Sequence, residues 1–441
     1  MNILELLAEK WRNVDHPAIV LDGSEVEFKD IIEMPCDHLS EISKGDVVAL
    51  IGDFNPRTVS NLLHLIDMET IIVPLTVETR SDHEYFFSSA LVDWIVEGGN
   101  VLGRKHSDKH DLIDKLRQRQ SGGLVLFSTG TTGRPKAILH DLTLFLQRYS
   151  LPRPQLKTLA FLLFDHIGGI NTLLHTMYNK GTLILTKEKS VESVINLIND
   201  HQIQVLPTTP TFLRMMLFSG QIPHKIPRSL RIITYGTEKM DEETLQKLTE
   251  MLPSVDFRQT YGMSELGILR VKSEAPNSLF MKIGGEGVET RIREDNLEIK
   301  SNSRMMGYLN APSPFDEFGW YKTNDLVESK NDWIKIVGRS NGVVNVGGLK
   351  FLLNEIENAC YGHPEIKLAL AEARTNPITG QHVELRVQIG KNSTLQISEI
   401  KQFLSAKLPI HMIPRRITLG MVEFNHRYKK NLDSRTGLDN E

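Results

Sequence analysis

The chain of 441 residues contains only two cysteines, Cys36 and Cys360. They lie far apart and lack metal-ligating neighbours, which excludes a disulfide scaffold and fits a reducing, cytoplasmic environment. The chain also lacks a large excess of charge of either sign. Its net charge is −4, so we expect no nucleic-acid partner. No apolar run approaches the ~20 residues that span a bilayer, and residues 1–13 lack the continuous apolar core of a signal peptide.

What the sequence does contain is an alternation of apolar runs and helical segments. A chain of this length is too long for one core, so two or three domains are expected. Apolar runs predict strands at 124–128, 158–164, 182–186, 203–207 and 231–235, with helical segments between them. This alternation is typical of an α/β fold with largely parallel sheets.

The pattern changes twice in the second half of the chain. From about residue 281, short alternating strands predict a smaller antiparallel or barrel-like subdomain. A compact α+β unit begins near residue 342. We therefore expect an N-terminal domain at 1–338, with its subdomain at about 281–338, and a C-terminal domain at 339–441.

The most informative segment is LVLFSTGTTGRPKA at 124–137, a strand that leads into a loop of hydroxyls and glycines. Backbone N–H groups exposed by glycine, hydroxyl donors and a lysine charge together suit a polyphosphate. The loop is not a Walker A sequence, because its glycines are too close together and Ala137 follows the lysine. The alternative is a flexible surface turn. The candidate phosphate-binding residues are Ser128, Thr129, Gly130, Thr131, Thr132, Gly133 and Lys136.

A second motif, QTYGMSELG, occupies 259–267. Tyr261 could stack on a flat ring, and Ser264 could donate to a phosphate oxygen. Glu265 could hold a hard divalent cation, which prefers carboxylate and phosphate oxygens. Taken alone, the segment also fits an ordinary polar turn.

Two further motifs follow, YKTNDL at 321–326 and GRSNG at 338–342. Asp325 could accept hydrogen bonds from both hydroxyls of a ribose, because a carboxylate is an acceptor that can bind in a bidentate manner. Arg339 could pair with a ribose or a phosphate. Taken alone, these segments also fit a surface turn and a charged linker.

The order and spacing of the four motifs resemble the adenylate-forming superfamily, which includes acyl- and aryl-CoA synthetases, adenylation domains of nonribosomal peptide synthetases and beetle luciferases. The resemblance extends from residue 17 to the C-terminus. It implies a large N-terminal domain of stacked mixed or parallel sheets and a small mobile α+β C-terminal domain. It also implies a reaction in which ATP, with Mg²⁺, activates a carboxylic acid to an acyl-adenylate, after which a thiol displaces AMP.

The resemblance assigns roles to these residues. The loop up to Lys136 is similar to a pyrophosphate-binding loop, and Asn341 occupies the hinge position, where the family usually has Asp. Asn324 replaces the usual glycine before Asp325, and asparagine tolerates the left-handed backbone there. The implied nucleotide contacts are Gly236, Thr237, Tyr261, Gly262, Ser264, Asp325 and Arg339, with Glu265 as the Mg²⁺ ligand.

The segment FDHIGGI at 164–170 gives information about the pocket that would bind the carboxylic acid. It resembles the gate of acyl- and aryl-CoA ligases at His166, while a rival alignment matches Phe164 and Asp165 to amino-acid adenylation domains. Either alignment is compatible with a helix that Asp165 caps. The expected pocket residues are Phe164, His166, Ile167, Gly168, Tyr235 and Met263.

Near the C-terminus, HRYKKN at 426–431 replaces the family's usual Gly-Lys loop. Lys430 is our choice for the lysine that contacts the carboxylate and the α-phosphate, and Lys429 is the alternative. The alternative interpretation of this segment is a solvated basic tail without a catalytic role. The main hypothesis is an acid–thiol ligase, monomeric or homodimeric, that uses coenzyme A or a carrier-protein phosphopantetheine. The alternatives are an enzyme that loads a free-standing carrier with an amino or hydroxy acid, and a degenerate nucleotide-binding member.

Overall fold

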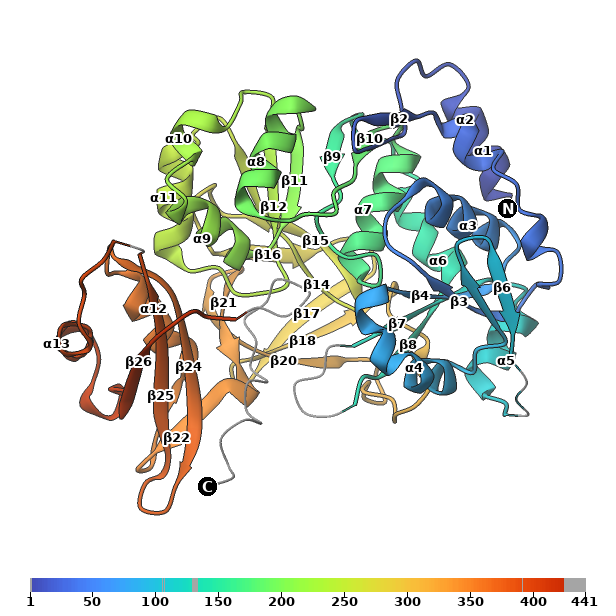
Figure 1. Ribbon diagram of the computed structural model, residues 1–441. Helices are drawn as coiled ribbons and strands as arrows, with labels where there is room; N and C mark the ends of the chain where they lie inside the picture. The colour runs from blue at the N-terminus through green and yellow to red at the C-terminus, as the bar shows by residue number, and fades with distance from the viewer. Residues whose placement is uncertain (1, 105, 107, 129–133, 391, 424–441) are drawn as a thin grey trace.

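A computed structural model describes residues 2–104, 106, 108–128, 134–390 and 392–423. In these residues, two seven-stranded sheets, a seven-stranded antiparallel sheet and a five-stranded C-terminal sheet carry the helices (Figure 1). The α/β fold class is thus confirmed. Within the described part of the chain, no helix is both long and apolar enough to traverse a bilayer.

The first large sheet has the order β19-β8-β7-β4-β3-β5-β6. Its central strands are wholly buried apolar runs, and β3, β4 and β7 are parallel. The antiparallel pairing of β7 and β8 brings the two ends of the hydroxyl-rich loop together. The strands are β3 (Val47–Ile51), β4 (Ile71–Leu75), β5 (Trp94–Glu97), β6 (Asn100–Gly103), β7 (Gly123–Phe127), β8 (Ala137–Asp141) and β19 (Gly307–Tyr308), with helices α3 (Pro56–Asp67), α4 (His83–Ala90), α5 (Asp111–Gln118) and α6 (Leu142–Leu146).

The second large sheet has the order β13-β12-β11-β9-β10-β1-β2 and is parallel from β13 to β1. The strands are β1 (Ile19–Leu21), β2 (Ser24–Val26), β9 (Lys157–Leu159), β10 (Thr182–Ile184), β11 (Val205–Thr208), β12 (Ile232–Tyr235) and β13 (Asp256–Gln259). The helices are α1 (Ile3–Trp11), α2 (Phe28–Ile32), α7 (Ile167–Tyr178), α8 (Val191–Asp200), α9 (Pro210–Phe218), α10 (Ile222–Lys225) and α11 (Glu242–Met251).

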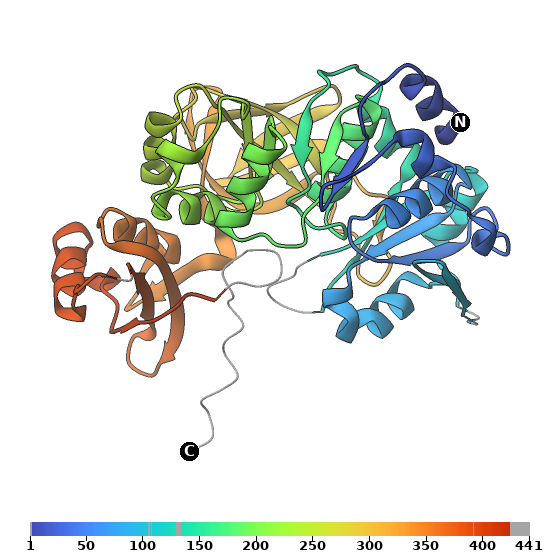
Figure 2. The ribbon, with the colours of Figure 1, turned by 45° about the horizontal axis from the view of Figure 1, so that its top comes forward.

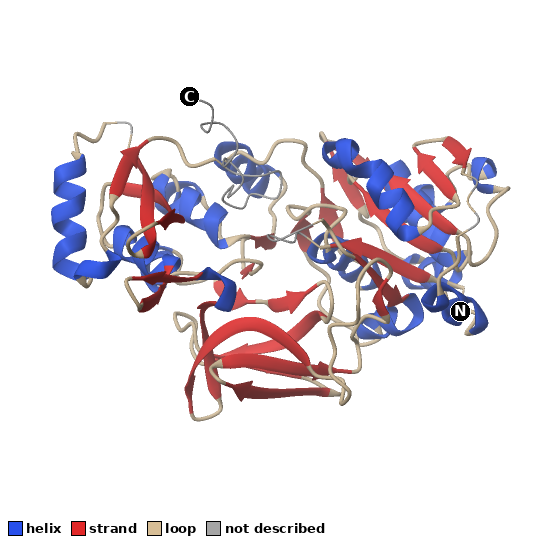
Figure 3. Cartoon of the chain, turned by 90° about the horizontal axis from the view of Figure 1, so that it is seen from below, coloured by secondary structure: helices blue, strands red, loops and turns tan. Residues whose placement is uncertain are grey.

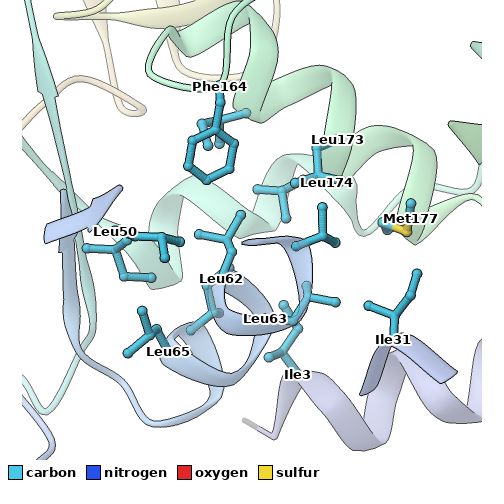
Figure 4. Packing of buried hydrophobic residues seen from close by; sticks show 14 of the residues in the cluster. Ile3, Ile31, Leu50, Leu62, Leu63, Leu65, Phe164, Leu173, Leu174 and Met177 are labelled. Atoms are coloured by element: carbon cyan, nitrogen blue, oxygen red, sulfur yellow. The ribbon is translucent and has the colours of Figure 1, made fainter. Parts of the chain in front are cut away.

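Helix α7 joins the two large sheets through a shared core. Its residues Leu173, Leu174 and Met177 pack in one cluster with Leu62 and Leu63 of α3 (Figure 4). These α7 positions recur at helical spacing, so they form one apolar face. The opposite face of α7 is consequently turned towards the second sheet.

The antiparallel sheet starts at Tyr261 rather than near residue 281. After β13 the chain reverses in a hairpin of β14 and β15, so the second motif already belongs to this sheet. Figure 3 shows it as the curved red strands at the bottom centre. The strands are β14 (Tyr261–Met263), β15 (Gly267–Ser273), β16 (Met281–Gly284), β17 (Val288–Arg293), β18 (Asn296–Ser301), β20 (Tyr321–Lys330) and β21 (Trp333–Arg339).

The C-terminal sheet begins at Val343, directly after a short 3-10 turn at Ser340–Gly342, and has its own apolar core. The elements of this C-terminal unit are β22 (Val343–Val346), β23 (Leu349–Leu352), α12 (Leu353–Tyr361), β24 (Ile366–Asn376), β25 (Gly380–Ile389), α13 (Ile397–Lys407) and β26 (Arg416–Leu419). Helices α12 and α13 contribute to this core.

A buried arginine of α9, Arg214, contributes to the contact between this unit and the helices of the second large sheet. Arg214 is 3% exposed, and its Nε donates to the carbonyl oxygen of Lys367 at 2.8 Å. The guanidinium also lies 3.4 Å from the ring centroid of Tyr361 on α12. Figure 2 shows the orange-to-red C-terminal unit beside the green helices and away from the blue N-terminal elements.

Candidate active site

A cavity of about 840 Å³ lies between the second large sheet, α7 and the start of the antiparallel sheet. The strands contribute alternate residues to it, because successive side chains point to opposite faces of a sheet. The neighbours Leu159, Leu206 and Ile233 face the core instead. The strand residues that line the cavity are Thr158, Val205, Pro207, Ile232, Thr234 and Arg258, together with Thr208 at the end of β11 and with Gly236 and Thr260 directly after β12 and β13.

The described ends of the hydroxyl-rich loop, Ser128 and Lys136, line the cavity. The Lys136 N–H donates to Oγ of Ser128 at 3.0 Å, and the Ser128 N–H donates to the Lys136 carbonyl at 3.0 Å. The expected residues 129–133 lie outside the described residues. Arg134 also lines the cavity, so this end carries two cationic side chains suited to phosphate.

Glu265 is the sole carboxylate among the described residues that line the cavity. Its Oε1 accepts a 2.8 Å hydrogen bond from the hydroxyl of Tyr308, and burial together with Glu265 raises the pKa of that hydroxyl. Lys136 Nζ lies 4.8 Å from the Tyr308 ring centroid. Tyr308 therefore links the expected Mg²⁺ ligand to the expected phosphate lysine.

No group of three metal-ligating side chains occurs in the described part of the chain. A single carboxylate nevertheless fits Mg²⁺ bound to a nucleotide, because this ion takes one or two protein carboxylates and completes its shell with phosphate oxygens and water.

Asp325 connects the second and third motifs. It is 4% exposed, and its Oδ2 accepts a 2.6 Å hydrogen bond from the Tyr261 hydroxyl. Its Oδ1 accepts from Nε of Arg339 at 3.0 Å. Burial and Asp325 raise the pKa of Tyr261 well above its usual value, so the phenol stays a donor. Asn324 has φ +60, the left-handed backbone expected for it.

Tyr261 and Arg339 line the cavity, and Asp325 lies directly behind them. Gly262, Ser264 and Thr237 line it as well. At Gly236 a Cβ atom would come within 2.2 Å of Oγ1 of Thr260, so this close approach requires glycine.

The expected acid pocket is assembled only in part. His166, Ile167, Gly168 and Met263 line the cavity. Phe164 does not: it is fully buried in the shared core, edge-to-face with Phe54 at 5.4 Å between ring centroids. Tyr235 is likewise 1% exposed in the other core, because it sits on the opposite face of β12 from Thr234.

The cap of α7 also differs from the expectation. His166, not Asp165, is the N-cap, and its Nδ1 accepts from the Gly168 N–H at 3.1 Å. Asn341, the expected hinge, lies in the 3-10 turn and lines the cavity. Lys429 and Lys430 lie outside the described residues.

Comparison with known proteins identifies this arrangement. The family model described as "AMP-binding enzyme" matches residues 47–303, more than half of the chain. The chain belongs to the AMP-binding enzyme family. This match confirms the resemblance to adenylate-forming enzymes, and it covers the first two motifs of the site.

Relatives of this AMP-binding enzyme are distant. The chain is 22% identical to phenyloxazoline synthase MbtB of Mycolicibacterium paratuberculosis over 92% of its own length and 39% of that protein. It is 23% identical to 4-coumarate–CoA ligase 3 of Oryza sativa subsp. japonica over 64% of its length and 57% of that protein. The chain thus spans between two-fifths and three-fifths of these relatives.

Among solved structures, ATP-bound MatB from Rhodopseudomonas palustris superposes with a TM-score of 0.76 at 18% identity, over 97% of each chain. This likeness confirms the fold of the AMP-binding enzyme.

One buried histidine beside the site makes the stability of this AMP-binding enzyme depend on pH. His140 is 2% exposed, its Nε2 lies 2.6 Å from the Ser264 carbonyl oxygen, and burial lowers its pKa from 6.5 to about 4. Above pH 6.5 both the folded and the unfolded states hold it neutral. As the pH falls from 6.5 towards 4, only the unfolded state takes up the proton, so stability is lost by about 1.4 kcal/mol per pH unit from this group.

We therefore expect the free energy of unfolding to drop between pH 7 and pH 5, with about 2 kcal/mol of the drop absent in His140→Gln. Urea unfolding followed by tryptophan fluorescence at the two pH values measures this. Equal drops in wild type and variant would contradict the assignment.

Proposed function

We propose that this AMP-binding enzyme is an acid–thiol ligase of the acyl-CoA synthetase type. It joins ATP and a carboxylic acid into an acyl-adenylate and then transfers the acyl group to a thiol. The observation that carries the proposal is that one cavity holds the phosphate-type loop ends, Glu265, and Tyr261 with Arg339 in front of Asp325.

In the first step, a carboxylate oxygen of the acid attacks the α-phosphorus of ATP. The new O–P bond forms as the bond to the bridging oxygen breaks, and pyrophosphate leaves with that electron pair. Ser128, Arg134 and Lys136 hold the departing phosphates, since fixed donors stabilise charge that develops on a leaving group. Mg²⁺, held by Glu265 and the phosphates, would neutralise part of that charge.

Asp325 positions the nucleotide through the ribose. Its two oxygens are already oriented by Tyr261 and Arg339, so they lose little freedom when hydroxyls bind. In the second step a thiolate attacks the acyl carbon, and AMP leaves with the carboxyl-derived oxygen. The thiol is that of phosphopantetheine, carried by coenzyme A or by a carrier protein.

The experiment that tests the proposal is ATP–pyrophosphate exchange with a panel of carboxylic acids, with and without Mg²⁺. We expect acid-dependent exchange that needs Mg²⁺ and falls at least about tenfold in Glu265→Gln, because the variant keeps the shape but loses the charge. The matched control is Glu286→Gln, an exposed residue in the turn between β16 and β17. Absence of exchange with every acid would overturn the proposal in favour of a non-catalytic nucleotide-binding protein.

A further inference from the structure

Beyond Ile167, the face of α7 that lines the cavity is mainly polar. It lies on another side of the helix from the apolar face that packs on α3, which Figure 4 shows at Leu173, Leu174 and Met177. Its residues recur at helical spacing, so they form a continuous stripe. The stripe consists of Gly168, Asn171, Thr172, His175, Thr176 and Asn179.

The stripe makes the cavity a long slot. From Gly168 to Asn179 the helix rises about 16 Å, at 1.5 Å per residue. The first turn of α7 lies at the carboxyl ends of the strands, the edge of the sheet at which Ser264 and Glu265 follow β13, while its last turn lies at their amino ends, next to the segment before β9. A substrate whose carboxylate reaches the nucleotide therefore has room to extend along α7.

The strand side of the slot differs from the helix side. Val205, Pro207 and Ile232 present apolar surface there. A carbon skeleton can lie on this surface, while the polar groups of α7 face its other side. The strand wall thus offers this apolar surface beside the polar side chains of Thr158, Thr208 and Thr234, while the lining face of α7 beyond Ile167 is mainly polar.

The far end of the slot is cationic and well ordered. Arg153 lines it, and the Arg153 N–H donates to Oδ1 of Asn179 at 2.7 Å. Nδ2 of Asn179 donates to the His175 carbonyl at 2.8 Å, which ties the Arg153 segment to the last turn of α7. The loop backbone is held, while the side chains of Arg153 and His175 are exposed.

The charges at this end are not balanced by the protein. Within the described residues the guanidinium of Arg153 has no ion-pair partner, whereas Arg258 is paired with Asp256 at 2.6 Å. The sole carboxylate described along the cavity, Glu265, lies at the nucleotide end. His175 lines the same end, and its imidazole can donate a hydrogen bond from a ring N–H.

We propose that Arg153 and His175 bind a second anionic group of the acid, at the end of the slot away from the adenylated carboxylate. This inference rests on the proposed function and names its substrate class: acids with a carboxylate or comparable anion at the far end. Arg153 supplies the charge and His175 a hydrogen bond. An acid with an uncharged far end would leave the Arg153 guanidinium solvated by water, and it would gain neither the ion pair nor the charge-assisted hydrogen bond.

The test compares acids in matched pairs, each a dicarboxylic acid of graded length up to about 16 Å and its monomethyl ester. ATP–pyrophosphate exchange is measured with wild type, Arg153→Gln and Arg153→Glu. We expect wild type to prefer the diacid by at least about tenfold in kcat/KM, mainly through KM, since the far group binds equally in ground and transition states. Arg153→Gln should abolish the preference, and Arg153→Glu should shift it to the ω-amino acid of the same length.

The matched control is Lys157→Gln, which removes a nearby exposed charge that does not line the slot. It should keep the wild-type preference. Exchange with equal kcat/KM for diacid and monoester would overturn the inference and leave the proposed function standing. No exchange with any acid would overturn both.

Discussion

Lys430→Ala is expected to slow acyl-adenylate formation by about 10²–10³-fold, because one positioned cation or donor at a developing charge contributes that much. An attacking carboxylate and a phosphate repel each other, and a lysine between them lowers this barrier. The residue lies outside the described part of the chain, so its role rests on the family resemblance. Single-turnover formation of the adenylate, measured with radiolabelled ATP, gives the rate.

The second half-reaction provides the internal control. Transfer from a supplied acyl-adenylate to the thiol needs no lysine at the α-phosphate, so its rate should stay within about twofold of wild type. Lys429→Ala is the neighbouring control and should leave both steps nearly intact. The opposite ranking of the two variants would assign the role to Lys429, and equal small effects in both would make the segment a solvated basic tail.

Asp325→Ala is expected to lower kcat/KM for ATP by about 10–150-fold, which corresponds to about 1.5–3 kcal/mol for hydrogen bonds to a charged acceptor. The same substitution leaves the Tyr261 hydroxyl and the Arg339 guanidinium without their shared acceptor. We therefore expect a loss of stability of about 1–3 kcal/mol as well. Titration of ATP in pyrophosphate exchange and urea unfolding measure the two effects.

A ribose analogue separates binding from stability. With 2′-deoxy-ATP, wild type should lose affinity while Asp325→Ala loses little more, because the acceptor of that hydroxyl is already gone. Asp332→Asn, at the exposed end of the hairpin of β20 and β21, is the matched control and should behave as wild type. Equal losses from the missing hydroxyl in wild type and Asp325→Ala would remove Asp325 from the ribose site.

Much of the fold could be predicted because many of its strands are short and mainly apolar, with helical patterns between them. β7 and β11 are examples, at 124–128 and 203–207. The start of the antiparallel sheet was missed by about twenty residues, since its first hairpin lies inside the QTYGMSELG motif and reads as a polar turn. The left-handed Asn324 could be predicted because the family resemblance places it where a glycine is usual, and asparagine tolerates that backbone.

The site was less predictable than the fold, because strand register decides which side chains point into the cavity and which point into a core. Phe164 and Tyr235 are large and adjacent to motif residues, yet both point into cores. Tyr308 and His140 were not predicted as part of the site's surroundings. Nothing local marks them: Tyr308 comes from a two-residue strand that returns to pair with β8, and His140 is one member of an apolar run. Only the tertiary fold places them beside Glu265 and Ser264.

The buried contact of Arg214 has a consequence for the balance between the two domain arrangements. If the C-terminal domain turns about Asn341 between the two half-reactions, as the resemblance implies, Arg214 must release the Lys367 carbonyl and the Tyr361 ring each time. A desolvated guanidinium that loses its partners raises the free energy of the intermediate arrangements. This contact therefore favours the docked arrangement at equilibrium, and a ligand shifts the balance only if it binds the two arrangements with unequal affinity.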